Sequence, residues 1–224
     1  MSRSKISNRR NHGMTLLESL VVMVLLAVLV AMLTPAFAPR QPNIARIRCV
    51  NNLRAIGAPF RIWANDHLDA YPWELSTNEG GTKEYAFGPE VYRHFQIMQN
   101  ELGQTPKILL CPADKDRFFA TNFINFNNSN LSYFAGITIL ATFTNTHLFL
   151  SGDRHLTNGT SARRGLLKLA TNDPAGWAGG IHGDEQNPTG NILFSDGSVF
   201  SLKTPGLRQA LQKPGAAPAM VAVP

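Results

Sequence analysis

A single carboxylate, that of Glu18, stands inside an otherwise apolar run of twenty residues from Met14 to Leu33. A charged side chain in such a segment costs roughly 2.5 to 3.5 kcal/mol on membrane-insertion scales, and it usually serves a function with a partner. A position near a helix N-terminus lowers this cost, because the macrodipole there favours negative charge. Two interpretations follow from these residues alone: the side chain reaches the membrane interface, or it pairs with a charged group of another chain.

Histidine and acidic side chains recur in the last third of the sequence. The residues concerned are His182, Asp184, Glu185 and Asp196, together with the pair Asp153 and His155. Such groups can transfer protons or bind a metal. However, the sequence contains no HExxH, no Gly-x-Ser-x-Gly and no phosphate-cradling loop. We therefore expect a protein that is not an enzyme, with a membrane-anchored enzyme as the weaker alternative.

Calcium is a second interpretation of the acidic loops. This ion takes six to eight oxygen ligands, which loops rich in Asp, Asn and backbone carbonyls can supply. Five side chains are candidates for such a site: Asp173, Asp184, Glu185, Asn187 and Asp196. Their spacing matches no known calcium motif, so a solvated polar loop is the alternative. No cofactor is required by the sequence.

The two cysteines, Cys49 and Cys111, are too few for a disulfide scaffold. They can form one bridge if the domain lies outside the cytoplasm. The loop so closed would hold about 60 residues and would stabilise the fold by several kcal/mol. Sequence alone leaves open whether the two side chains meet.

The chain of 224 residues has room for one membrane segment and one globular domain. Its formal net charge of +6 is concentrated at the start. Four basic residues, Arg3, Lys5, Arg9 and Arg10, precede residue 13, and without them the net charge is about +2. The high charge is therefore weak support for a nucleic-acid partner, and none is expected.

A basic stretch followed by an apolar run is the pattern of a targeting or anchoring segment. Twenty helical residues span roughly 30 Å, the thickness of the hydrocarbon core of a bilayer. Positive residues stay on the cytoplasmic side, so the chain beyond about residue 35 should lie across the membrane. An ordinary secretory signal cut near Ala38 is the alternative.

The stretch GMTLLE, residues 13–18, resembles the class III signal of type IV prepilins and type II secretion pseudopilins. The resemblance implies that prepilin peptidase cuts between Gly13 and Met14 and methylates the new N-terminus at Met14. Glu18 becomes the fifth residue of the mature chain and pairs with the N-terminal amine of a neighbouring subunit during assembly. Pro35 falls where pilins often have a helix-kinking proline.

Further segments resemble a large bacterial group of prepilin-like proteins. They are CVNNLRAIG (49–57), WANDHLDAYP (63–72), LLCPADKD (109–116), LSYFAGI (131–137) and LSGDR (150–154). The group ends on a His followed, nine residues later, by Asp-Gly. Here His182 and Asp196-Gly197 are separated by thirteen residues, so a fixed geometry between them is in doubt.

Hydrophobic spacing predicts an α+β fold in which a long N-terminal helix, partly transmembrane, packs on a small antiparallel sheet with long loops. The resemblance to prepilins implies that this fold is pilin-like. The second half of this helix carries apolar residues at three- and four-residue steps over 44–63, and Pro39, Pro42 and Pro59 can bend it. A helix is predicted over 89–102, strands over 131–140 and 147–153, and a short helix over 205–212. Alternating residues on both sides of Asp196-Gly197 predict a hairpin with a type I′ turn.

The expected organisation has five parts: a basic leader (1–13), a transmembrane and assembly helix (14–34), the periplasmic half of the helix (35–67), an α+β head (68–212) and a flexible tail (213–224). The resemblance implies a structural subunit of a type II secretion pseudopilus or a type IV pilus-like fibre. It would sit in the inner membrane as a single-pass protein, with a cytoplasmic leader and a periplasmic head, and would contact prepilin peptidase and other subunits. The alternative is a minor pilin with a ligand- or surface-binding head. The sequence leaves open the kind of fibre, whether the subunit is a major or a minor one, and the ligand of the head.

Overall fold

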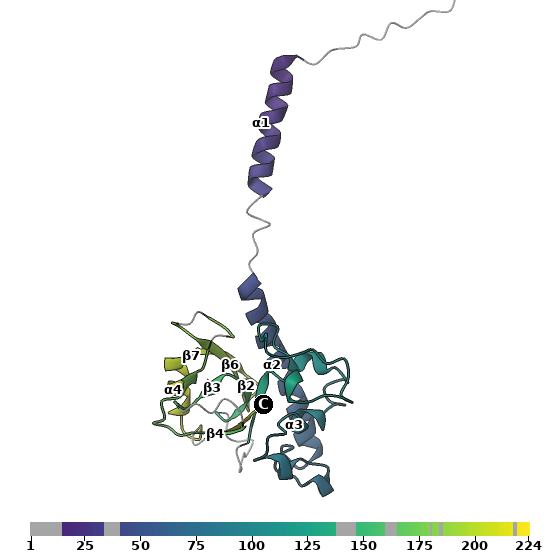
Figure 1. Cartoon of the computed structure of the whole chain (residues 1–224), viewed down its shortest axis with the longest axis vertical. Helices are drawn as coiled ribbons and strands as arrows, with labels where there is room; N and C mark the ends of the chain where they lie inside the picture. Colours follow the sequence, from purple (N-terminus) through teal and green to yellow (C-terminus); the bar gives the residue numbers. More distant parts are fainter. Residues whose placement is uncertain are drawn as a thin grey trace, which may run out of the picture. The chain divides into compact units, whose positions relative to one another are not determined.

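The computed structural model describes residues 15–33, 41–137, 147–159, 165–179, 181–183, 186–216 and 219–224. Contacts between residues divide the chain into two units, one up to Arg40 and one from Gln41 to Pro224. The second unit, called the head below, contains all the described strands (Figure 1). The predicted boundary of the head at residue 68 differs from this division, because the helix that starts at Gln41 belongs to the second unit and is buried in it from Cys49 onward.

The first unit contains α1 (Leu16–Leu33), which is built from Leu, Val, Ala and Met except at Glu18 and Ser19. In the part of the chain that the structure describes, no helix combines the length and apolarity needed to cross a membrane. Pro35, the predicted kink, lies outside the described residues, as do Gly13 and Met14.

The head is organised around α2 (Gln41–Asp66), which includes Pro59. Its buried face carries Leu53, Ile56 and Phe60, each fully buried. Gly57 lies on the same face, and a Cβ there would be 3.1 Å from the Leu193 side chain. The absence of a side chain at Gly57 therefore lets the helix approach the sheet closely.

The apolar stripe predicted for α2 is buried only from Cys49 onward. Ile44 and Ile47 have 48% and 59% of their surface exposed, so the expectation that they pack on the sheet is wrong. Their spacing is helical, but about half of each side chain is exposed to solvent, so this first part of the helix is less buried than the part from Cys49 onward.

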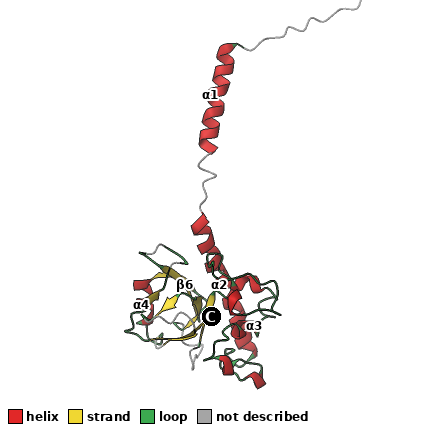
Figure 2. Cartoon of the chain, in the orientation of Figure 1, coloured by secondary structure: helices red, strands yellow, loops and turns green. Residues whose placement is uncertain are grey.

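Six strands form one antiparallel sheet in the order β4-β8-β1-β2-β6-β7. Figure 2 shows the strands on one side of α2, together with α4 (Thr204–Leu211), and α3 (Arg93–Gln96) on the other side. The strands are β1 (Tyr133–Gly136), β2 (Phe149–Asp153), β4 (Gly165–Leu169), β6 (Thr189–Phe194), β7 (Val199–Lys203) and β8 (Ala219–Val223). A second, two-stranded sheet pairs β3 (Leu156–Thr157) with β5 (Gly176–Trp177). The predicted α+β class with an antiparallel sheet is confirmed.

The main sheet is buried on both faces because successive side chains of a strand point to opposite sides. In β1, Tyr133 belongs to the core that contains α2, whereas Phe134 belongs to a second core. The second core includes Leu207 and Leu211 of α4 (Thr204–Leu211), the short helix predicted over 205–212. The sheet therefore forms the middle layer of the head.

The hairpin around Asp196-Gly197 forms as predicted, but its turn is not type I′. Only Gly197 of the two has a positive φ, of 85°, whereas a type I′ turn needs two. The Phe194 amide donates to the Ser198 carbonyl and the Gly197 amide to the Phe194 carbonyl. This is a type I turn followed by a left-handed glycine, a common three-residue hairpin connection.

The helix predicted over 89–102 is wrong in most of its length. Only α3 (Arg93–Gln96) is α-helical, and the flanking residues form successive tight turns. The apolar residues that predicted it, Val91, Phe95, Met98 and Leu102, are nevertheless all buried. Short 3-10 helices occur at η2 (Thr77–Glu79), η3 (Lys83–Tyr85), η4 (Pro106–Leu109) and η5 (Asn128–Asn130).

The flexible tail predicted for 213–224 is also wrong. Ala219–Val223 form β8, which lies inside the sheet between β4 and β1. Val221 is fully buried, and the Arg117 guanidinium donates to the Pro224 carbonyl at 2.7 Å. Pairing with two strands and burial on both faces order this segment, and its local sequence does not reveal either.

Candidate functional site

Thr15 and Glu18 form a reciprocal cap at the start of α1. The Glu18 amide donates to the Thr15 hydroxyl oxygen at 3.3 Å, and the Thr15 amide donates to the Glu18 carboxylate, also at 3.3 Å. This is the capping-box arrangement, which satisfies two backbone donors that a helix start leaves unpaired. Glu18 therefore has a local role in its own helix, and both hydrogen bonds are exposed to any competing partner.

A cluster of polar groups lies in the interior of the head, and we call it the polar centre: Cys49, Cys111, Asp153, His182 and Asn191. Cys49 of α2 and Cys111, which follows η4, form a disulfide with their Cα atoms 5.0 Å apart. Both cysteines are fully buried. The bridge fastens the loop after η4 to the helix at the centre of the head.

Asp153 and His182 meet beside this disulfide. The His182 Nε2 atom lies 3.5 Å from the Cys111 Sγ atom and 3.6 Å from the Asp153 Oδ2 atom. The same Oδ2 atom accepts hydrogen bonds from the Asn191 amide at 2.7 Å and from its side chain at 2.9 Å. The Asp153 Oδ1 atom is buried without a hydrogen-bond partner. One oxygen of this carboxylate is thus satisfied and the other is not.

Burial shifts the pKa values of both groups toward their neutral forms. It raises the pKa of Asp153 to about 7, although the hydrogen bonds from Asn191 act in the opposite direction. It lowers the pKa of His182 to about 4, and the positive charge of Arg46 adds to this effect. At neutral pH, His182 is therefore a neutral base.

A buried ion pair adjoins the polar centre. Arg154, the residue after Asp153, donates to both carboxylate oxygens of Asp114 at 2.8 and 2.9 Å. It also contacts the exposed Asp116 at 3.0 Å. Asp114, Asp116 and His155 lie close enough together to share a metal ion, but both carboxylates already pair with Arg154.

The separate sequence motifs of the head meet at this place. The disulfide joins the 49–57 motif to the 109–116 motif, and the Asp114–Arg154 pair joins the latter to the 150–154 motif. The Asn52 side chain adds a hydrogen bond of 2.9 Å to the Leu110 carbonyl. His182, the first residue of the terminal His and Asp-Gly element, lies beside Asp153 of the 150–154 motif and so brings a fourth motif to the same place. These segments thus form one interior site although they are far apart in sequence.

The polar centre is poorly placed for catalysis on an external substrate. Asp153 and His182 have only 1% and 4% of their surface exposed. A proton-transferring pair must come within hydrogen-bond reach of a substrate, and here both groups are enclosed by the core. This geometry favours a structural or ion-binding role over acid–base catalysis.

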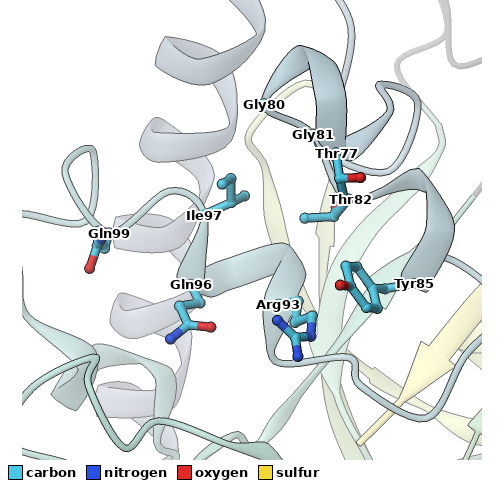
Figure 3. A pocket seen from close by; sticks show the side chains of 9 residues that line it. All are labelled: Thr77, Gly80, Gly81, Thr82, Tyr85, Arg93, Gln96, Ile97 and Gln99. Carbon is cyan, nitrogen blue, oxygen red and sulfur yellow. The ribbon is translucent and has the colours of Figure 1, made fainter.

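A cavity of about 350 Å³ opens beside α3. Figure 3 shows Arg93 next to Tyr85, with Gln96 and Thr82 nearby. The Arg93 guanidinium lies 4.4 Å from the centre of the Tyr85 ring and 2.9 Å from the Glu90 carboxylate. Because Glu90 balances its charge, this cavity offers a polar wall rather than an anion site.

A larger cavity, of about 700 Å³, lies between α2 and the segment around η4. Arg48 and Lys107 line it, together with Asn51, Asn52 and Phe119, and no acidic residue does. The Lys107 ammonium lies 5.6 Å from the centre of the Phe119 ring. We call it the basic cavity, since it combines two cations with amide groups and an aromatic ring.

Comparison with known families gives one match, at the N-terminus. Residues 8–34 match the family model of the prokaryotic N-terminal methylation motif. The chain carries a prepilin-type signal. No curated protein and no solved structure gives a significant match to this chain. The resemblance of its later segments to a prepilin-like group therefore has no independent support.

His182 and the Asp196-Gly197 pair have separate surroundings. His182 is in the polar centre, whereas Asp196 accepts hydrogen bonds from the amide and hydroxyl of Ser198 within the β6–β7 turn. Gly197 supplies the positive φ of that turn. Turn formation thus accounts for Asp196-Gly197, as the sequence interpretation favoured.

The calcium candidates are not gathered into one group in the described structure. Asp173 accepts a hydrogen bond from the Ala170 amide, and Asp196 accepts those from Ser198. Neither belongs to a described group of acidic or histidine side chains close enough to share an ion. Asp184 and Glu185 lie outside the described residues, and Asn187 is in the loop after them.

Sequence reasoning missed several members of these sites. Arg154 and Asn191 were not singled out, although Arg154 is in a quoted motif, and the basic cavity was not foreseen. A charged residue directly after a buried strand, as in Ser151-Gly152-Asp153-Arg154, was the available signal for Arg154. For Asn191, which is buried inside β6, the local sequence held no comparable signal.

Proposed function

We propose that this protein is a prepilin-like structural subunit of a type II secretion pseudopilus or a type IV pilus-like fibre. Prepilin peptidase cuts it between Gly13 and Met14 and methylates the new N-terminus at Met14. The observation that carries the proposal is the methylation motif over residues 8–34, with Glu18 in the first turn of α1.

The proposed role of Glu18 is to set the register of neighbouring subunits. A buried carboxylate is tolerated when it is paired, and an α-amino group with a pKa near 8 is largely protonated at neutral pH. Before assembly, the capping box with Thr15 gives the carboxylate a local partner. In the fibre, the amine of a neighbouring Met14 replaces or joins the Thr15 amide at the same carboxylate.

The proposed location is the inner membrane, with the leader in the cytoplasm and the head on the opposite side. The basic residues before Gly13 support this orientation through the positive-inside rule. A disulfide between Cys49 and Cys111 fits an oxidising compartment outside the cytoplasm.

The basic cavity favours a second function, display of a binding head by a minor subunit. Arg48 and Lys107 would pair with an anionic group, Asn51 and Asn52 would bind hydroxyls, and Phe119 would contact a sugar ring. The ligand of that chemistry is an acidic polysaccharide. Binding of the full-length protein to immobilised polyuronate should fall at least 10-fold in Lys107→Ala and stay unchanged in Lys115→Ala, which does not line the cavity. Equal binding by both variants would exclude this role.

The assembly function is tested in the native host by the N-terminal residue and its mass, in membrane and sheared-fibre fractions. Wild type is compared with Glu18→Ala and with Ser19→Ala, a polar neighbour whose hydroxyl only bonds the Leu16 carbonyl of its own helix. We expect N-methylated Met14 in all three chains. Only Glu18→Ala should be lost from fibres, because it alone lacks the carboxylate.

Two results would contradict this function. An uncut leader, or cleavage near Ala38, would exclude prepilin processing. Normal processing with equal fibre incorporation of Glu18→Ala and wild type would retain the peptidase as a partner but remove the role of Glu18 in assembly.

A further inference from the structure

The polar centre brings together four side chains of metal-binding type from four parts of the sequence. Cys49 and Cys111 supply two sulfur atoms, and His182 supplies a nitrogen within 4.8 Å of both. Asp153 supplies an oxygen 3.6 Å from that nitrogen. Two sulfurs, one imidazole and one carboxylate are ligands that Zn²⁺ accepts in tetrahedral sites.

The two distances at the His182 nitrogen fit ligands that share one ion, whereas Asp153 lies outside the group of ligand atoms within 4.8 Å of one another that Cys49, Cys111 and His182 form, so its carboxylate has to move toward the sulfurs on binding. With zinc–sulfur bonds near 2.3 Å and zinc–nitrogen and zinc–oxygen bonds near 2.1 Å, tetrahedral ligands are about 3.6 Å apart for S and N, and about 3.4 Å for N and O. The His182 Nε2 atom lies 3.5 Å from the Cys111 sulfur and 3.6 Å from the Asp153 oxygen. The latter distance is too long for a direct hydrogen bond between the two groups.

Charge and burial also suit a cation at this place. The Asp153 Oδ1 atom is fully buried and has no hydrogen-bond partner, which is costly for a carboxylate oxygen. Zinc bound to two thiolates and one carboxylate would have a net charge of −1. Arg46 acts electrostatically on both Asp153 and His182, so a balancing positive charge is near.

We propose that the reduced form of the chain binds one Zn²⁺ ion through Cys49, Cys111, His182 and Asp153. The reduced form precedes the disulfide, because the cysteines are synthesised as thiols. Each thiol loses one proton on binding, so one Zn²⁺ replaces two H⁺. Thiol–disulfide exchange with an external disulfide, which takes the two electrons and is itself reduced to two thiols, joins the two sulfurs, removes two ligands and releases the ion. The polar centre thus holds either a metal or a disulfide, a property independent of fibre assembly.

The test uses the full-length protein in detergent, reduced with a phosphine in denaturant and refolded without oxygen. Co²⁺ is the probe, because tetrahedral cobalt with thiolate ligands gives visible bands and a sulfur-to-cobalt charge-transfer band. We expect one equivalent of Co²⁺ to bind the reduced protein, Zn²⁺ to displace it, and the disulfide form to give no such bands. X-ray absorption of the zinc form should show two sulfur and two nitrogen or oxygen ligands.

Variants assign the ligands. His182→Gln and Asp153→Asn should each lower the Co²⁺ affinity at least 10-fold, whereas His155→Gln, in the neighbouring Asp114 and Asp116 group, should leave it unchanged. Absence of the charge-transfer band in refolded, reduced wild type would overturn the proposal. So would an unchanged affinity in His182→Gln. If a variant does not refold, the ligand count from X-ray absorption of wild type decides, and a count other than two sulfurs rejects the site.

Discussion

The Asp114–Arg154 pair is the most enclosed ion pair among the described residues, with side-chain exposures of 1% and 8%. Its two parallel hydrogen bonds compensate the burial of both charges. Removal of one partner from a buried pair leaves an unpaired charge and usually costs about 3 to 5 kcal/mol. We predict a loss of this order in the free energy of unfolding for Asp114→Asn, measured by urea denaturation.

Asp116 provides the control for this prediction. It contacts the same arginine at 3.0 Å, but 75% of its side chain is exposed. Exposed pairs contribute roughly 0 to 1 kcal/mol, so Asp116→Asn should have little effect. Equal losses for the two variants would show that burial does not determine the strength of this network.

His94 should make the head sensitive to acid. Burial lowers its pKa from the ordinary 6.5 to about 4, and its Nδ1 atom bonds the Thr82 hydroxyl at 2.7 Å. The unfolded chain therefore takes up a proton at a higher pH than the folded chain, and protonation favours unfolding. The stabilisation by neutral His94 is complete above pH 6.5 and is lost as the pH falls toward 4.

The measurement compares wild type with His94→Gln by urea denaturation at pH 7 and pH 5. At about 1.4 kcal/mol per pKa unit, His94 should account for roughly 2 kcal/mol of the decrease in wild type. The variant should lose that part of the pH dependence. His155 and His182 also have lowered pKa values and remain in both proteins, so the comparison isolates His94. A decrease of the same size in both proteins would disprove the assignment.

At the scale of elements, local signals predicted some parts of the head and not others. The β6–β7 hairpin was found because alternation and an Asp-Gly pair lie within one short stretch. The helix predicted over 89–102 failed because tight turns place Val91, Phe95 and Met98 on one buried side without an α-helical backbone. The apolar spacing therefore predicted burial correctly and the type of backbone incorrectly.

The strand β8 yields the sharpest test at this scale. Removal of residues 219–224 would be harmless for a flexible tail, but here it takes one strand from the interior of the sheet. We predict that the truncated protein shows no cooperative unfolding transition, because β1 loses one of its two neighbouring strands and β4 loses the strand that joins it to the described sheet. Double replacement of the exposed Gln212 and Lys213 by alanine is the control and should change stability by less than about 0.5 kcal/mol. A cooperative transition in the truncated protein would restore the tail interpretation.

For the whole molecule, the Cys49–Cys111 disulfide is the covalent link between the central helix and the loop after η4, across 62 residues of sequence. Closing a loop of that length stabilises a fold by about 4 kcal/mol in the chain-entropy model. We predict a loss of that size for the Cys49→Ala, Cys111→Ala double variant, measured by urea denaturation in the presence of a metal chelator. A difference below 1 kcal/mol would mean that the surrounding core alone fixes the two segments.

The sequence predicted the components of the polar centre better than their arrangement. Cys49, Cys111 and His182 were each singled out, because such residues are chemically distinctive. Their meeting with Asp153 depends on how α2 packs on β2 and β6, and no local pattern specifies that packing. The same limit explains why Asp173 and Asp196 were grouped as calcium ligands although they belong to different loops.

The position of β8 also determines when the head can be completed. A ribosome delivers the chain from the N-terminus onward, so Ala222 appears long after Ala135, the residue that it pairs with. Until then β1 and β4 have no strand between them, and the sheet is divided. The main sheet is therefore completed only by the last strand of the chain to be synthesised.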